Sequence, residues 1–208
     1  MNKKELAKQL LVEIEKIYPD AKTELTNWKT PFQFLVCIML SAQTTDKQVN
    51  KVTKKLFEKY PDAKLLSRAK LNDITDTVRG INYFRTKAKH IVQTATIIES
   101  NYAGEPPKDL DELQKLPGVG YKTANVFLND LYKSNQGIAV DTHVARVAMT
   151  YGLTKNTNPT KIAHDLEKLY PKRDWYKVNS LFVLYGRYIL KAKKRVWEKV
   201  VLKENIVI

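Results

Sequence analysis

The stretch LPGVGYKTAN at residues 116–125 decides the fold of this chain. Pro117 ends a preceding helix because its ring blocks the helical backbone, and Gly118 and Gly120 can adopt positive φ angles. Val119 between them is a small apolar side chain that can point into a core. The stretch therefore predicts a tight hairpin between two helices.

The backbone of such a hairpin suits an anion. Its N–H groups, together with the N-terminus of the following helix, point outward and can bind a phosphate group without a charged side chain. A plain connection between two helices would show the same pattern, so the hairpin alone leaves both interpretations open.

Helical periodicity extends through nearly the whole chain. Apolar residues recur at helical spacing, and no stretch alternates with a period of two for long enough to indicate a sheet. Thr30 and Pro31 open a helix whose segment 34–40 is apolar on every side, which predicts burial all round. We therefore expect an all-α protein with one compact body or two lobes. The other expected helices cover residues 6–17, 46–60, 62–67, 71–78, 85–101, 109–115, 121–133, 141–151, 159–169 and 174 onward.

The composition indicates which kind of molecule the protein binds. The 208 residues include 36 lysines and arginines against 22 aspartates and glutamates, a formal net charge of +14. A chain this basic usually binds a polyanion, most often nucleic acid, although the charge can also serve solubility alone. Hydrophobic residues make up 43%, which is enough for a buried core and argues against disorder.

Cysteine usage restricts the cofactors and the compartment. Cys37 is the single cysteine, which excludes an intramolecular disulfide, a cysteine-based zinc site and a cluster that needs four thiolates. The N-terminal residues lack the apolar region and cleavage site of a signal peptide, and no apolar run reaches about 18 residues. We expect a cytoplasmic protein, associated with the nucleoid if the source is prokaryotic, without a membrane span.

Lys122 is the first candidate for chemistry. It falls in the first turn of the helix after the hairpin, where the helix dipole disfavours a positive charge, and this helix is otherwise largely apolar. Desolvation there would favour the neutral amine, a nucleophile that can attack an electrophilic sugar carbon and form a Schiff base. The alternative is a lysine that extends to solvent or to a DNA phosphate.

Asp141 is the second candidate. It lies in AVDTHVAR at residues 139–146, where it predicts a helix N-cap, and capping alone would explain it. The preceding loop can span ~26 Å when extended, which is enough to return Asp141 to Lys122. An amine and a carboxylate facing one cleft could displace a base and stabilise the positive charge that develops on the sugar. We expect His143 and Arg146 to orient or pack rather than react.

Three motifs together resemble a known family. LSAQTTD at residues 40–46, the hairpin stretch at 116–125 and VDTHVAR at 140–146 occur in the order found in the endonuclease III branch of the helix-hairpin-helix DNA glycosylases. The similarity runs from about residue 24 to Arg187. The resemblance implies a two-lobed, all-α DNA glycosylase and AP lyase that removes oxidised pyrimidines. It also implies a monomer that acts on damaged double-stranded DNA and has no membrane partner.

The resemblance assigns roles to both candidates and to the hairpin. Lys122 stands where the family has its Schiff-base lysine, and Asp141 matches the catalytic aspartate. Related adenine-mismatch and thymine-mismatch glycosylases typically have Ser or Tyr at the lysine position, so Lys122 favours lyase activity. Gly118, Val119 and Gly120 match the hairpin that grips a DNA phosphate, in some members with a bound monovalent cation. No other metal is expected.

Further positions match residues that accompany base flipping. Gln43 matches the polar side chain that fills the gap left by the flipped base. Aligning TKA at residues 86–88 with the family's SKA run places Tyr83 at an inserted wedge, where members often have Leu. Arg85 and Lys87 flank this wedge in a stretch without acids, and we expect them to contact phosphates. A loop glutamine and a core aromatic are the alternatives for Gln43 and Tyr83.

The C-terminal segment departs from the family pattern. Family members usually follow a Gly-Arg-Tyr sequence with four cysteines that hold a four-iron–four-sulfur cluster, whereas residues 186–188 are followed by no cysteine. We therefore expect no cluster and no other cofactor. Residues 187–203 carry seven basic residues and one acid. We expect a helix there to replace the cluster in packing, with Lys191, Lys193 and Lys194 on phosphates, the alternative being a solvated tail.

The expected organisation is a central helical barrel lobe at residues 23–134, which ends in the helix-hairpin-helix motif, and a second lobe made of residues 1–22 and 135–208. Two rival functions stay open. One is the same fold with another base preference, such as mismatched thymine, 8-oxoguanine or an abasic site alone. The other is a DNA-binding module without chemistry, and the presence of both Lys122 and Asp141 argues against it.

Overall fold

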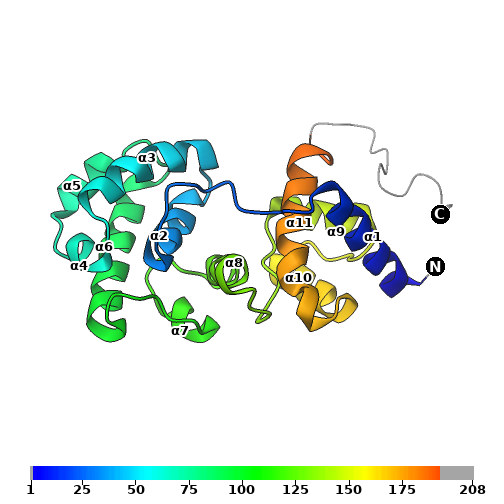
Figure 1. Cartoon of the computed structure of the whole chain (residues 1–208). Coiled ribbons are helices and arrows are strands. Elements are labelled where there is room, and N and C mark those ends of the chain that lie inside the picture. Colours follow the sequence, from blue (N-terminus) through cyan, green and yellow to red (C-terminus); the bar gives the residue numbers. More distant parts are fainter. Residues whose placement is uncertain (1, 193–208) are drawn as a thin grey trace. The chain divides into compact units, whose positions relative to one another are not determined.

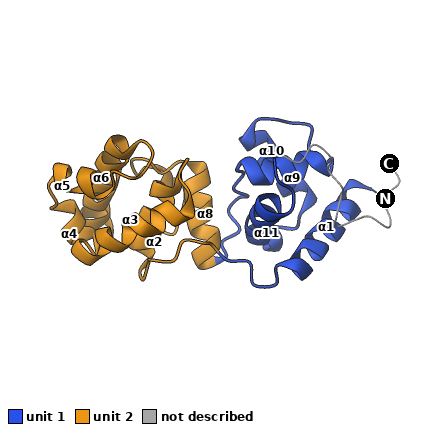
Figure 2. Ribbon diagram, turned by 90° about the horizontal axis from the view of Figure 1, so that it is seen from above, with its two compact units in different colours: residues 1–22, 133–208 blue, residues 23–132 orange. Residues whose placement is uncertain are grey.

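The computed structural model describes residues 2–192, and every regular element in that range is a helix. The expected all-α fold is confirmed. The chain divides into two compact units, which Figure 2 shows in different colours. The central unit consists of residues 23–132, and the terminal unit combines residues 1–22 with residues 133–208.

The central unit is built from seven helices (Figure 1). The long helix α6 packs against α4 and α5, while α2 contacts α3, α6 and α8, which places α2 at the centre of the unit. The helices are α2 (Pro31–Ser41), α3 (Asp46–Lys59), α4 (Ala63–Ser67), α5 (Leu71–Thr77), α6 (Phe84–Tyr102), α7 (Leu110–Gln114) and α8 (Tyr121–Tyr132).

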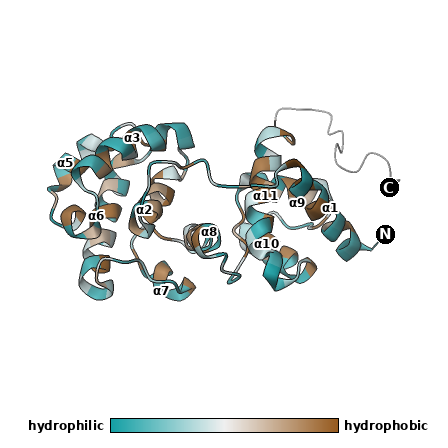
Figure 3. Cartoon of the chain, viewed as in Figure 1, coloured by the Kyte–Doolittle hydropathy of each residue, from teal (hydrophilic) through white to brown (hydrophobic). Residues whose placement is uncertain are grey.

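Helix α2 is buried on every side. The Thr30 side chain caps it by accepting a hydrogen bond from the Gln33 amide, and Pro31 occupies its first position. Every residue from Phe32 to Leu40 is buried, and Figure 3 shows hydrophobic residues along this helix. The expected all-round burial of this segment is confirmed.

Cys37 lies in the middle of α2 and has no exposed surface. Burial raises the pKa of its thiol to about 12. The thiol is therefore protonated and unreactive at neutral pH.

The terminal unit is completed by its N-terminal helix. Helix α11 lies along α9, and α1 packs on α10 and α11. The Tyr170 hydroxyl donates a hydrogen bond to the Ala7 carbonyl oxygen at 3.0 Å, which ties the first helix to residues far along the chain. The helices among its described residues are α1 (Lys3–Ile17), α9 (Thr142–Thr150), α10 (Pro159–Leu169), a short 3₁₀ helix (Lys172–Asp174) and α11 (Trp175–Tyr188).

Four expected helices begin one residue later than the sequence pattern suggests, and one of them, α11, begins at Trp175 instead of Asp174. The other three share one cause. Asp62, Asp109 and Asp141 stand just outside α4, α7 and α9, and their carboxylates accept backbone amides from the first turns. Each aspartate is therefore an N-cap rather than a helical residue.

Candidate active site

The hairpin joins α7 to α8 and is anchored to α6. Leu116 and Val119 are buried, and the Val119 amide donates to the Leu116 carbonyl oxygen at 3.1 Å within the turn. The Thr94 hydroxyl of α6 donates to the Pro117 carbonyl oxygen at 2.9 Å. The apolar side of the hairpin is therefore fixed in the core of the central unit, as expected for the Val119 side chain.

The two hairpin glycines are present for different reasons. Gly118 has a φ of +78°, and a Cβ atom there would lie 2.7 Å from His90 Nδ1, so conformation and space both require glycine. Gly120 has no positive φ, and a Cβ atom there would meet nothing within 4 Å. The Gly120 amide also forms no hydrogen bond with another residue in the described range. Gly120 thus lies on open backbone that a phosphate can approach.

Two expectations for the hairpin backbone are corrected. A positive φ is found at Gly118 but not at Gly120. The Val119 amide does not point outward, because it is used inside the turn. The Gly118 and Gly120 amides form no hydrogen bond with another described residue, so both are open donors of the hairpin.

Lys122 is the second residue of α8, and its side chain is exposed. Ala124, Phe127 and Leu128 direct the opposite side of the helix into the core of the central unit. The expected position at the helix N-terminus is found, whereas the expected desolvation is not. The apolar residues that suggested burial belong to the other face of α8, and they leave the amine accessible.

Asp141 caps α9 in the terminal unit. Its Oδ1 atom accepts hydrogen bonds from the amides of His143 at 2.8 Å and Val144 at 2.9 Å. Neither bond uses Oδ2. The cap therefore orients the carboxylate and leaves its second oxygen for other contacts.

The segment that leads into Asp141 is fixed by side chains from two other helices. Glu167 of α10 accepts the Ile138 amide at 3.1 Å, and Asn179 of α11 donates to the Ala139 carbonyl oxygen at 2.7 Å. Asn179 is buried, and no sequence pattern predicted its role. In the sequence, the only indication of its role is that a polar residue stands on the buried face of an apolar helix.

Arg146 closes the end of α11. Its Nε donates to the Leu190 carbonyl oxygen at 2.7 Å, and its Nη2 donates to the Gly186 carbonyl oxygen at 2.5 Å. Nη2 also lies 2.9 Å from His143 Nδ1, which is the acceptor because a guanidinium only donates. A Cβ atom at Gly186 would lie 2.9 Å from His143 Cβ, so glycine permits this close approach of α9 and α11. His143 and Arg146 therefore support the packing of the two helices.

Gln43 and Tyr83 lie on two loops of the central unit. Gln43 follows α2, and Tyr83 precedes α6. Both residues are exposed, Tyr83 over 66% of its surface, so a core aromatic is the wrong interpretation of Tyr83. Their φ angles are +56° and +58°, a left-handed conformation that non-glycine residues adopt at a cost in energy.

Lys87 is not available to DNA in this structure. The residue is 8% exposed, and its Nζ donates to the carbonyl oxygens of Leu40 at 2.8 Å and Ala42 at 2.5 Å. Nζ also donates to Thr44 Oγ1 at 3.4 Å. Desolvation lowers the pKa of Lys87 to about 8. The expected phosphate contact is wrong for Lys87, because α6 directs this side chain toward the end of α2.

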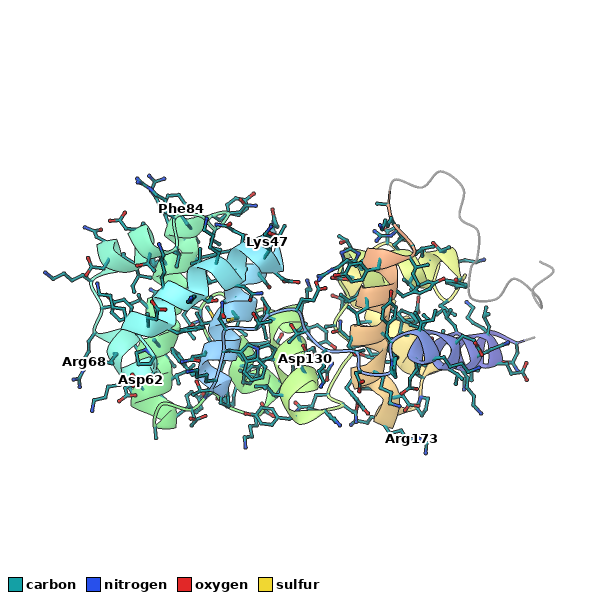
Figure 4. All side chains as sticks on the ribbon, turned by 45° about the horizontal axis from the view of Figure 1, so that its top comes forward. Lys47, Asp62, Arg68, Phe84, Asp130 and Arg173 are labelled. Carbon is teal, nitrogen blue, oxygen red and sulfur yellow. The ribbon has the colours of Figure 1, made fainter. Side chains whose placement is uncertain are left out.

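Arg85 remains at the surface next to Tyr83. It is exposed, and its guanidinium lies over the Phe84 ring, 4.8 Å from the ring centroid. Figure 4 shows Phe84 and Lys47 at the same end of the central unit, away from Arg68. Exposed positive charge therefore accompanies the loop that carries Tyr83.

The basic C-terminal residues are described only in part. Lys191 is exposed, and its amide donates to the Ile189 carbonyl oxygen at 3.1 Å. Lys193 and Lys194 lie outside the described residues, as does the helix expected to follow them.

The chain lacks the residues for a four-cysteine cluster. Its 208 residues include one cysteine, and that cysteine is buried in α2. Between residues 2 and 192, no group of three or more His, Cys, Asp or Glu side chains is placed to hold a metal ion. The donor set does not fit the cluster of the resembling family.

Comparison with known proteins identifies the family. Residues 36–172 match the family model described as HhH-GPD superfamily base excision DNA repair protein. The chain belongs to this superfamily. This HhH-GPD protein is 42% identical over 193 residues to endonuclease III of Synechocystis sp. (strain ATCC 27184 / PCC 6803 / Kazusa), a match that covers 93% of this chain and 88% of the relative. Endonuclease III of Bacillus subtilis (strain 168) is 39% identical over 184 residues, which are 88% of this chain and 83% of the relative.

A solved structure has the same fold. It is described as a trapped endonuclease III–DNA covalent intermediate, an estranged-adenine complex, and it matches with a TM-score of 0.87 at 39% identity over 93% of this chain and 91% of that chain. This HhH-GPD protein is therefore a base excision repair enzyme of the endonuclease III type, a DNA glycosylase and AP lyase. Residues 2–192 contain no helix that is long and apolar enough to cross a membrane.

Proposed function

We propose that this HhH-GPD protein removes oxidised pyrimidines from double-stranded DNA and then cleaves the strand at the resulting abasic site. Lys122 is the nucleophile, and Asp141 is the carboxylate that assists it. The place of Lys122 carries the proposal, because an accessible amine stands at the N-terminus of α8, two residues after the open backbone of Gly120. A phosphate bound at Gly120 would bring the adjacent sugar to this amine.

In the glycosylase step, the neutral amine of Lys122 attacks C1′ of the damaged nucleotide, and the bond between C1′ and the base breaks. The base leaves with the bonding electron pair and takes up a proton. Positive charge develops on the sugar, and Asp141 Oδ2 stabilises it, because Oδ1 is engaged at the start of α9. The amine then loses a proton, the bond between C1′ and the ring oxygen breaks, and the ring oxygen keeps the electron pair and takes up a proton. A protonated imine between Lys122 and C1′ remains.

In the lyase step, the protonated imine makes the hydrogen at C2′ acidic. Removal of that proton breaks the bond between C3′ and its phosphate oxygen, and the phosphate leaves with the electron pair. Water then releases the sugar remnant from Lys122 as an aldehyde. Both activities therefore share one covalent intermediate.

Gln43 and Tyr83 accompany base flipping. Taking a nucleotide out of the stack costs a few kcal/mol and leaves a gap in the duplex. The exposed Gln43 amide would hydrogen-bond the orphaned partner base, and the exposed Tyr83 ring would stack beside it. Their exposure supports this role, because both side chains are available to enter the gap.

Phosphate contacts supply the electrostatic part of the affinity, in keeping with the net charge of +14. The hairpin binds one phosphate through its backbone, with a monovalent cation beside it as in some members of the resembling family. The proposed contacts are residues 118–120, Arg85, Lys191, Lys193 and Lys194.

The reaction as proposed needs no cofactor. An amine and a carboxylate suffice for Schiff-base formation and β-elimination, and neither step changes the oxidation state of a protein group. We propose that the enzyme acts as a monomer, because one chain carries both of the proposed reacting side chains, Lys122 and Asp141.

Lys122→Gln tests the proposed nucleophile by borohydride trapping on a duplex with one abasic site. The parent protein is expected to form a covalent adduct with DNA, because borohydride reduces the imine to a stable amine. Lys122→Gln is expected to lower the adduct yield by about 100-fold or more, because an amide cannot form the imine. Lys64→Gln removes an exposed lysine of α4 and is the matched control. Equal trapping by Lys122→Gln and the parent would overturn the assignment.

A panel of duplexes, each with one lesion, tests the base preference. Oxidised pyrimidines are expected to be excised faster than mismatched thymine or 8-oxoguanine. A preference for either of those bases, or cleavage of abasic sites alone, would replace the proposed substrate class while leaving the Lys122 chemistry in place. Absence of trapping by the parent on every duplex would indicate a DNA-binding module without chemistry.

A further inference from the structure

The loops that carry Gln43 and Tyr83 are hydrogen-bonded to each other. The Asn82 side-chain amide donates to the Gln43 carbonyl oxygen, and the Asn82 backbone amide donates to Thr44 Oγ1 at 3.3 Å. Asn82 directly precedes Tyr83 in the chain. One residue therefore joins the backbone of the Gln43 loop to the backbone of the Tyr83 loop.

Lys87 supports the same junction from the interior of the central unit. Its ammonium group has three hydrogens and meets three oxygen acceptors, which belong to Leu40, Ala42 and Thr44. The Thr44 hydroxyl oxygen thus accepts hydrogen bonds from both Lys87 and Asn82. The two loops are connected to each other and to a buried charge beneath them.

The junction also packs against α3. A Cβ atom at Gly80 would lie 2.3 Å from Gln48 Nε2, so the loop before Tyr83 runs directly against the helix that follows the Gln43 loop. The nearest atom is the far end of the flexible Gln48 side chain, so a larger residue there would displace that side chain and not the backbone of α3. The Tyr83 loop is therefore held against the first turn of α3 as well as against Gln43.

Gln43 and Tyr83 are both held in a strained conformation at this junction. A non-glycine residue stays in the left-handed region only where its surroundings over-determine it. On one side of the junction, three hydrogen bonds restrain the backbone in this conformation. They are accepted by the carbonyl oxygens of Ala42 and Gln43 and by the Thr44 hydroxyl. The backbones that carry both side chains are thus held in one arrangement before any DNA is bound.

We propose that Asn82 is a positioning residue for base flipping, which couples the two loops so that Gln43 and Tyr83 enter the duplex as one rigid pair. This inference rests on the proposed function, in which those two side chains fill the gap. Without the coupling, each loop would be ordered separately as the nucleotide leaves the stack, which costs conformational entropy. Asn82 acts through its neighbours and needs no contact with DNA.

Asn82→Ala tests the coupling, because it removes the side-chain donor and keeps the backbone amide. Asn82 is exposed, so the variant is expected to fold with a circular dichroism spectrum like that of the parent. Asn72→Ala is the matched control, since Asn72 is an exposed residue of α5 whose side chain makes no hydrogen bond in the described range. Thr44→Val, which removes the shared acceptor, is the second variant.

Two measurements separate positioning from general damage to the enzyme. The fluorescence of 2-aminopurine opposite an abasic site reports how far the partner base is unstacked when side chains enter the gap. The β-elimination rate is compared between that duplex and the same abasic strand without its complement. The single strand has no paired base to displace, so its cleavage does not require the inserted pair.

Asn82→Ala is expected to lower both the fluorescence gain and the duplex cleavage rate about tenfold, while single-strand cleavage stays within about twofold of the parent. Thr44→Val is expected to show the same selectivity with a smaller loss, and Asn72→Ala no change. Equal losses on duplex and single strand, or an unchanged Asn82→Ala protein, would overturn the inference.

Gln43→Ala and Tyr83→Ala distinguish failure of the inference from failure of the proposed function. If both variants lose the fluorescence gain and Asn82→Ala retains it, only the coupling is wrong. If neither loses the gain, the proposed roles of Gln43 and Tyr83 fail and the coupling fails with them.

Discussion

The C-terminal ends of α2 and α11 are both closed by a positively charged side chain from another helix. Lys87 of α6 binds carbonyl oxygens at the end of α2, and Arg146 of α9 binds carbonyl oxygens at the end of α11. In both units a cation satisfies carbonyl groups near a helix end and opposes the negative end of the helix dipole. We call Lys87 and Arg146 the two cationic caps. Each lies next to a segment with a proposed site residue: Gln43 follows α2, and Asp141 precedes α9.

The two cationic caps differ in how deeply their positive charge is buried. Lys87 is buried, and desolvation lowers the pKa of its compact ammonium group to about 8. Arg146 is half-buried, and its planar guanidinium donates in two directions. The comparison teaches that burial of a lysine at the end of α2 makes that helix end sensitive to pH near 8.

Arg146→Gln is expected to have the largest effect on stability. It breaks the hydrogen bonds to Gly186 and Leu190 and leaves both carbonyl oxygens without this donor, at a cost of about 3 kcal/mol in the free energy of unfolding. Urea unfolding of the variant measures the loss, and Arg68→Gln, which changes an exposed arginine, is the control. Arg146→Lys should recover only part of the loss, because an ammonium group lacks the planar fork that reaches both carbonyls. A loss no larger than that of Arg68→Gln would contradict the capping role.

Lys87→Met is expected to destabilise the protein less than Arg146→Gln. The variant loses three hydrogen bonds but also removes the cost of burying a charge, so at pH 7 the loss is about 1 kcal/mol. Urea unfolding at pH 7 measures it, and Lys89→Met, a change of an exposed lysine on the same helix, is the control.

The loss of stability in Lys87→Met is expected to depend on pH. The pKa of folded Lys87, about 8, lies below its ordinary value of 10.5, so between these values the unfolded state binds a proton that the folded state has released. The stability of the parent therefore rises with pH across that window relative to Lys87→Met, by about 2 kcal/mol between pH 7 and pH 10. A constant difference between the parent and Lys87→Met over that range would disprove a depressed pKa.

Asp130→Asn changes a buried acidic group instead of a buried basic one. We expect it to have the smallest effect on the free energy of unfolding. Burial raises the pKa of the Asp130 carboxyl to about 7, and this side chain of α8 forms no hydrogen bond or ion pair with another described residue (Figure 4). The folded pKa lies above the ordinary value of 3.8, so the folded state binds the proton more tightly, and stability falls as pH rises between these values.

Asp130→Asn should therefore be more stable than the parent at pH 8, by less than about 1 kcal/mol, and should lose this advantage near pH 4. Thermal unfolding at the two pH values measures the difference. Asp20→Asn, which changes an exposed aspartate, is the control, and an equal gain from both variants would refute the role of burial.

Most helix starts could be predicted because their signals are local. Thr30 and Pro31 mark the start of α2 through a side-chain cap and a fixed φ angle, and the structure begins the helix at Pro31. Asp62 and Asp109 indicated helix starts for the same reason, with an error of one residue because a cap stands outside its helix.

The orientation of side chains within the site could not be predicted in the same way. The sequence places Lys87 and Lys122 on helices, but which side of each helix meets the core depends on residues far away. Lys87 is buried because its Nζ meets oxygens 43 to 47 residues earlier in the chain. Lys122 is exposed because the apolar residues after it belong to the opposite face. Asn82 and Asn179 were missed because a single asparagine forms no pattern, and their roles follow only from the loops that they join.

The burial of Cys37 makes the protein convenient for site-specific labelling. Its thiol lies inside α2 with its pKa raised to about 12, so a maleimide dye would leave the native chain unmodified. Cysteines introduced at exposed Lys64 in the central unit and exposed Lys161 in the terminal unit could then carry a fluorescent donor and acceptor without prior removal of a native thiol. Energy transfer between the dyes would report the separation of the two units with and without damaged DNA.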